Sequence, residues 1–170
     1  MKPGVPAYRR WLRWLTVAVV AVGVIATLSY GSGAHLIVRY LDPPVGRWWN
    51  EHEYALMIGA ASALGMLLAI RFGVRLIEDA AVRGRAAAIS IIAGALILIP
   101  LARVSAALGR LGWTGAGGFD TYAMNTIVDK VLIAGVYFLK IAGFGILAGL
   151  AMFAAVAMAA SSGAAPRREA

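Results

Sequence analysis

The sequence predicts an all-α integral membrane protein, a single four-helix bundle with both termini in the cytoplasm. Composition, four long apolar runs and the placement of the basic residues lead to this prediction. Of the 170 residues, 61% are hydrophobic and 14% are charged, whereas a soluble domain has about 45–50% apolar and about 25% charged residues. An apolar excess of this size is typical of a chain whose solvent is largely the lipid bilayer.

Four apolar runs are each long enough for a helix that crosses the bilayer, which needs about 20 such residues. We expect the spans at residues 14–38, 54–77, 86–108 and 131–160. The first run is longer than the apolar core of a signal peptide, about 7–15 residues, which favours a retained helix. The chain then forms one membrane domain, residues 1–170, with loops at 39–53 and 109–130 on one side of the membrane.

The basic residues divide unequally between the two sides. One side receives ten of the 16 lysines and arginines: Lys2, Arg9, Arg10, Arg13, Arg71, Arg75, Arg83, Arg85, Arg167 and Arg168. The other side holds only Arg39, Arg47, Arg103, Arg110 and Lys130. The positive-inside rule therefore predicts cytoplasmic termini in a multi-pass protein of the bacterial inner membrane. Because topology accounts for the net charge of +8, we expect the lipid bilayer and no nucleic acid as a partner.

Candidates for catalysis or metal binding are few. The absence of cysteine excludes disulfides, thiol catalysis and iron–sulfur clusters, and argues against a structural zinc site. Glu51, His52 and Glu53 are neighbours along the chain, so on a helix their side chains point apart and form no metal site. A free-standing membrane enzyme or regulator is the weakest hypothesis, and we expect no catalytic residue, no metal and no resident cofactor.

The densest polar stretch of the first half, RYLDPPVGRWWNEHEYAL at residues 39–56, has a purely structural interpretation. Trp48 and Trp49 suit the headgroup region, where an indole buries its ring and keeps its N–H hydrated. The Pro43–Pro44 pair is expected to stop the first helix. Asn50 is expected to cap the second helix, with the next two glutamates in its first turn. The stretch would then be an interfacial turn and nothing more.

The same stretch also carries a family resemblance. The first span ends in Arg39 and Tyr40, a proline-containing turn and Trp48 follow, and Glu51 enters the second span. That span carries a patch of small residues, Gly59, Ala60 and Ala61, and leaves the membrane through the basic, glycine-containing segment AIRFGVRLIED at residues 69–79. Over residues 38–79 this arrangement resembles the small four-helix membrane subunit of TRAP transporters, the DctQ-like family.

The resemblance implies a non-catalytic accessory subunit that packs against a larger integral membrane subunit. In that family the large subunit carries the substrate and sodium sites, and a periplasmic binding protein delivers an organic acid. Three residues of the matching stretch, Arg39, Trp48 and Glu51, become candidates for contact with the partner. Lys140 departs from the family's pattern.

The two histidines offer a second function from a different class. His35 and His52 lie near the outer ends of the first two spans, on the same side of the membrane. Two neutral imidazoles on neighbouring helices can ligate haem b or a chlorophyll-type pigment. The alternative is therefore a small structural or cofactor-holding subunit of a respiratory or photosynthetic complex.

The fourth span holds a charge and a pair of glycines. A lysine inside the membrane indicates function by default, whereas a span that starts near residue 138 would leave Lys140 at the outer interface with a snorkelling side chain. We favour the interfacial position. Gly145 and Gly149 form a small-xxx-small pair, which serves either a contact within the bundle or contact with a partner.

Overall fold

The computed structural model describes residues 7–32, 41–110 and 127–162, without the side chains of residues 50, 51, 105–110, 161 and 162. The described part of the chain is helical: α1 (Ala7–Ser32), α3 (Pro43–Gly73), the short 3-10 helix η1 (Val74–Leu76), α4 (Ala80–Arg110) and α5 (Ile127–Ser162). Four of these helices are long and apolar enough to cross a membrane. The chain is accordingly a multi-pass membrane protein, as its composition predicted.

The start of α3 corrects one prediction. The helix begins at Pro43, so the segment 43–53 is helical, and its spanning part begins at His52. Asp42 is the N-cap in place of Asn50, because its carboxylate accepts a hydrogen bond of 3.3 Å from the Val45 N–H. Proline fits the first turn of a helix, where its missing N–H would have had no partner. The Pro43–Pro44 pair therefore starts α3.

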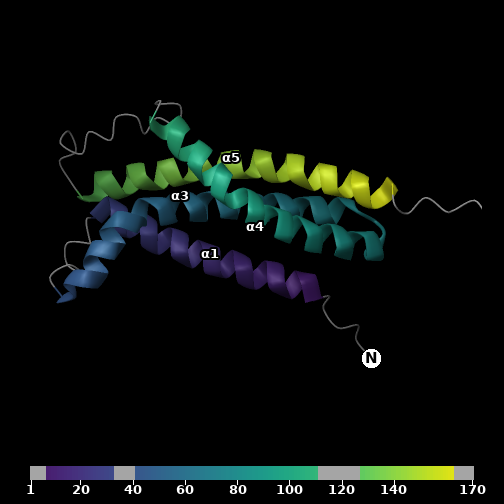
Figure 1. Ribbon diagram of the computed structural model, residues 1–170, viewed down its shortest axis with the longest axis horizontal. Helices are drawn as coiled ribbons and strands as arrows, with labels where there is room; N and C mark the ends of the chain where they lie inside the picture. Colours follow the sequence, from purple (N-terminus) through teal and green to yellow (C-terminus); the bar gives the residue numbers. More distant parts are fainter. Residues whose placement is uncertain (1–6, 33–40, 111–126, 163–170) are drawn as a thin grey trace, which may run out of the picture.

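The four long helices lie side by side in alternating directions (Figure 1). In the figure α1 and α4 run one way, and α3 and α5 run the other way. The start of α1, the α3–α4 connection and the end of α5 therefore share one end of the molecule, which we call the arginine end after Arg9, Arg13, Arg71, Arg75 and Arg83. The opposite end, where Tyr30, Tyr54 and Tyr137 lie, is the tyrosine end.

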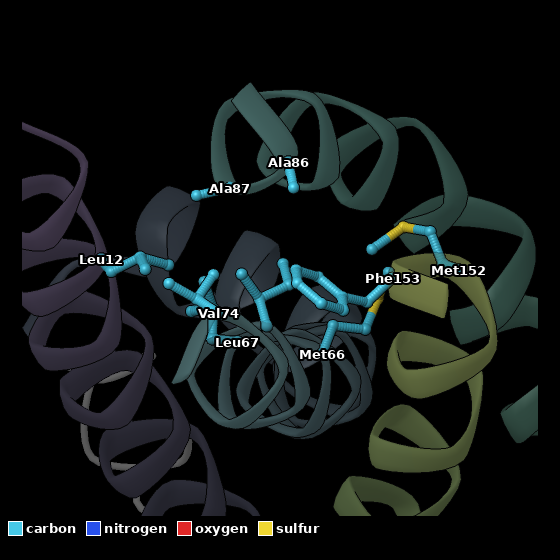
Figure 2. Close-up of a cluster of buried hydrophobic side chains, with 9 residues drawn as sticks. Leu12, Met66, Leu67, Val74, Ala86, Ala87, Met152 and Phe153 are labelled. Carbon is cyan, nitrogen blue, oxygen red and sulfur yellow. The ribbon is translucent and has the colours of Figure 1, made fainter. Parts of the chain in front are cut away.

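The core consists of two apolar clusters, and α3 contributes to both. The cluster nearer the arginine end collects side chains from all four long helices around Phe153 (Figure 2). The second cluster, nearer the tyrosine end, is built around Tyr137, Met57 and Ile141. Outside these clusters many large apolar side chains are exposed, including Ile92, Leu96 and Ile99 on α4, as expected of helices that face lipid tails.

Glycines bring the backbones of α3 and α5 into direct contact. A Cβ added at Gly145 would collide with the backbone oxygen of Ser62, and one added at Gly149 would lie 2.9 Å from the Cα of Met66. On the other helix, a Cβ at Gly65 would collide with the backbone of α5. Gly145 and Gly149 thus lie at an internal helix contact and are not open to a partner, although both were candidates for partner contact.

The connection from η1 to α4 ends in a second aspartate cap. The Asp79 carboxylate accepts hydrogen bonds from the N–H groups of Ala81 at 2.7 Å and Val82 at 3.1 Å. The Val82 N–H above all, then that of Ala81 and the charges of Arg85 and Arg83, hold the pKa of Asp79 below its usual range. These bonds satisfy N–H groups that the first turn of α4 would otherwise leave without a partner.

Replacing Asp79 with alanine should lower thermal stability more at neutral pH than in acid. Because the pKa of Asp79 is depressed in the folded protein, its contribution is present above the unfolded pKa, about 3.9. That contribution is lost as the pH falls through the lower folded value. Thermal unfolding of wild type and Asp79→Ala in detergent between pH 7 and pH 3 is the measurement. Midpoints that differ equally at both pH values would contradict the charged cap, and Asp79→Asn, which keeps an acceptor, is the control.

Candidate functional site

A buried polar network joins α1 to the first turns of α3 at the tyrosine end. The Trp49 indole N–H donates to the Ser29 hydroxyl at 2.6 Å, and that hydroxyl donates to Oε2 of Glu53 at 2.8 Å. Ser29 is 6% exposed and Glu53 4%. Buried polar groups are tolerated where they are hydrogen-bonded, so this network fixes the level at which α1 and α3 meet.

Three tyrosines continue the polar layer from this network to α5. The hydroxyls of Tyr54 and Tyr137 are 2.8 Å apart and hydrogen-bonded, and their rings are stacked. The ring of Tyr30 lies 5.4 Å from that of Tyr54. Residues of α1, α3 and α5 therefore form one continuous polar and aromatic layer at this end. Glu53 is its buried carboxylate, whereas the glutamate predicted to contact a partner was Glu51, two residues earlier.

His52 lies beside this layer and is exposed. Its ring stacks on Trp48 with 4.6 Å between centroids, and its Nδ1 lies 2.7 Å from the Trp48 carbonyl oxygen. When Nδ1 donates to that carbonyl, the lone pair of Nε2 points away from the hydrogen bond and is available to a ligand. The second histidine of the predicted pair, His35, lies outside the described residues. Among the described residues no group of three or more His, Cys, Asp or Glu could hold a metal ion.

The candidates for partner contact are placed unequally. Trp48 is half-exposed on the outward side of α3, where a neighbouring protein or lipid headgroups can reach it. Arg39 lies outside the described residues, and so does the side chain of Glu51. Gly145 and Gly149 face α3, as described above. Of the five candidates, Trp48 is thus the one that the structure places on an open surface.

Lys140 lies on α5 one turn beyond the polar layer, and the interfacial position that we favoured for it stays a prediction. One turn before it, Tyr137 is bonded to Tyr54, and beyond it Gly145 touches Ser62. Lys140 is therefore level with Met57, about 8 Å along α3 beyond His52, where the candidate span of that helix begins. Within the candidate span of α5, Ile127–Ala160, Lys140 lies about 20 Å from the start of the helix.

The surroundings of Lys140 are apolar. Its side chain is exposed, and among the described residues it has no hydrogen-bond or ion-pair partner. Val136, one turn earlier on the same face, lines an apolar groove of about 480 Å³ between α1 and α5. Val24, Leu28 and Leu132 are among the other residues of this groove. A lysine in such a place is costly unless an acceptor or an anion approaches it.

Searches against family models, curated proteins and solved structures found no match.

Proposed function

We propose that this protein is a non-catalytic accessory subunit that packs against a larger integral membrane protein. The exposed lysine within the candidate span of α5 carries the proposal, since Lys140 would otherwise face lipid without a partner. The α1–α5 groove beside it suits a helix of the partner, and a carboxylate on that helix would pair with the ammonium group. In this assignment the four helices form a bundle with both termini in the cytoplasm of a bacterial inner membrane.

The partner that we propose is the large subunit of a tripartite organic-acid transporter. The resemblance of residues 38–79 to the DctQ-like family supports this choice. The gathering of arginines at one end of the described helices supports the orientation, because the positive-inside rule places such an end in the cytoplasm. Trp48, half-exposed at the opposite end, would then lie at the periplasmic surface beside the partner.

Replacing Lys140 with methionine should release the partner. Lys140→Met keeps the length of the side chain but removes the charge that a buried carboxylate would require, so recovery of the partner should fall about tenfold or more. Lys140→Arg keeps the charge and should retain the partner. The measurement is purification of the tagged protein from its own membranes in mild detergent, with quantitative mass spectrometry of what accompanies it.

Lys130→Met is the matched control, because Lys130 precedes Lys140 on α5 by more than two turns, near the start of the helix. It should leave recovery of the partner unchanged. If Lys140→Met retained a large permease as well as wild type does, the intramembrane ion pair would be excluded. If no larger subunit accompanied wild type, the accessory role itself would be excluded.

The alternative is a small structural or haem- or pigment-holding subunit of a respiratory or photosynthetic complex. The hydrogen bond from His52 Nδ1 to the Trp48 carbonyl favours it, because this bond leaves Nε2 as the ligating nitrogen. A visible absorption band in the purified sample that is lost in His35→Ala or His52→Ala would establish this alternative. Electron-transfer proteins in place of a permease among the co-purified subunits would do the same.

A further inference from the structure

Five arginines converge on one pocket at the arginine end. The pocket has a volume of about 380 Å³. Its charged lining consists of Arg9 and Arg13 from α1, Arg71 and Arg75 from the end of α3 and η1, and Arg83 from the start of α4. Segments that are far apart in the sequence thus supply like charges to a single concave site.

The protein itself does little to neutralise these charges. No carboxylate belongs to the described lining of the pocket, and no salt bridge joins its five arginines to a described acidic residue. The adjacent connection carries Glu78 and Asp79, but the Asp79 carboxylate accepts from the first turn of α4. Arg83 donates to the carbonyl oxygens of Ile77 and Glu78, each at 2.8 Å. These carbonyls orient one guanidinium group but do not cancel its charge.

Membrane topology does not require this convergence. The positive-inside rule needs basic residues on one side of the membrane, at any position in the flanking segments. Arg10 and Arg85 meet that need at the same end without lining the pocket. Guanidinium groups that face one cavity repel each other, and that repulsion is relieved when an anion binds between them. The geometry therefore indicates an anion site.

An apolar groove begins one helical turn from this pocket, on the side toward the middle of the bundle. Leu12 of α1 and Val74 of η1 line the pocket. Leu15 of α1 and Ile70 of α3, each one turn further into the bundle, line the groove. The first section has a volume of about 180 Å³ and lies between α1, α3 and α4. A further section of about 310 Å³ shares Val19, Ala63 and Leu98 with the first and ends beside Gly59 and Ala55. The groove is lined almost wholly by apolar side chains.

We propose that the pocket and groove together bind one anionic phospholipid. The phosphodiester headgroup would lie among the arginines, whose planar forks pair with phosphate oxygens through two N–H groups at once. An acyl chain would lie in the groove between α1 and α4. Trp11 and Trp14 are exposed on the same stretch of α1, as expected at the level of lipid headgroups. This site is on a different face from Lys140 and does not depend on the proposed partner.

The test uses purified full-length protein in mild detergent and compares two lipids with identical chains, phosphatidylglycerol and phosphatidylcholine. Native mass spectrometry counts the lipids that each variant retains. Wild type should retain phosphatidylglycerol preferentially. The variant Arg71→Gln/Arg75→Gln should bind it about 30-fold more weakly, since each basic residue near the surface contributes about fivefold. The matched variant Arg10→Gln/Arg85→Gln removes the same charge outside the pocket and should bind as wild type does.

A second variant distinguishes a lipid from free phosphate. Gly59→Leu/Ala63→Leu fills the deeper groove, and a Cβ at Gly59 meets open space, so the fold should tolerate the change. This variant should bind long-chain phosphatidylglycerol more weakly. Its stabilisation by inorganic phosphate, measured as a thermal shift, should equal that of wild type. If this variant bound the lipid as wild type does, the groove would not hold an acyl chain, and the ligand of the pocket would be a phosphate-type anion instead of a lipid. If both double arginine variants lost the same affinity for phosphatidylglycerol, general surface charge and not the pocket would explain the binding.

Discussion

Replacing Gly145 with alanine should destabilise the protein by about 1–3 kcal/mol, and replacing it with valine should prevent α5 from seating on α3. The reason is the backbone of Ser62, which occupies the place that a Cβ at Gly145 would need. A backbone cannot move aside as the end of a flexible side chain can, so the two helices must separate. Reversible unfolding of the purified protein by a denaturing detergent, followed by circular dichroism, measures the change.

Gly143 on the same helix provides the matched control. A Cβ at Gly143 meets nothing within 4 Å, and alanine favours a helix over glycine by about 1 kcal/mol. Gly143→Ala should therefore leave stability unchanged or raise it slightly. Gly65→Ala and Gly59→Ala form a second such pair on α3, because the space beside Gly65 is filled and the space beside Gly59 is open. Equal effects of Gly145→Ala and Gly143→Ala would refute the close contact between backbones.

Removing the Ser29 hydroxyl should also cause a large loss, about 1–3 kcal/mol. Ser29→Ala deprives the Trp49 indole N–H of its acceptor and the Glu53 carboxyl group of a donor. Because Glu53 is almost fully buried, water cannot replace that donor freely. Thermal unfolding in detergent measures the loss, and Ser32→Ala, at the exposed end of α1, should have little effect.

A double-mutant cycle with Trp49→Phe separates the network from simple loss of packing. The two residues share one hydrogen bond, so the losses for Ser29→Ala and Trp49→Phe should overlap in the double variant. The sum of the single losses should exceed the loss of the double variant by about 0.5 kcal/mol or more. Strictly additive losses would mean that the two side chains act independently.

The helices could be predicted from the sequence because lipid imposes one dominant requirement. A backbone in hydrocarbon must satisfy its own hydrogen bonds, so a long apolar run becomes a helix. The four expected spans correspond to the four candidate spans of the structure, Ala7–Ser32, His52–Leu76, Ala80–Val104 and Ile127–Ala160. Their ends were less predictable, since charged residues can continue a helix beyond the membrane. The segment from Pro43 to the second span is an example.

The prediction that Asn50 caps α3 was wrong for a specific reason. A proline pair can end one helix or begin the next. The Pro43–Pro44 pair, which follows Asp42, was assigned to the end of the preceding helix. A proline is equally suited to the first turn of a new helix when an aspartate precedes it. The hydrogen bond from the Val45 N–H to the Asp42 carboxylate shows that the proline pair begins α3.

The candidate site depends on which residues of different helices lie at the same height in the bundle, and the sequence does not give these heights. Glu53 is buried because Ser29, on another helix, lies at the same height. Hydropathy places Lys140 on a helix, but its level relative to α3 follows only from the contact of Tyr137 with Tyr54. Likewise, the five pocket arginines appeared as three separate basic segments. The spacing of Trp49 and Glu53, four residues apart on one helix face, was the available sign of a shared partner.

The contact between α3 and α5 also has a consequence for synthesis. The glycine face of α3 emerges from the ribosome long before Gly145, because the whole of α4 is made in between. At about 5–20 residues per second, the interval from Gly65 to Gly145 lasts about 4–16 s. During that time the face that α5 will cover is bare, and α4 is the one long helix of the described chain made in that interval. The membrane insertion machinery must therefore protect the incomplete chain during this interval. A nascent chain arrested after α4 should be a preferred substrate of membrane proteases.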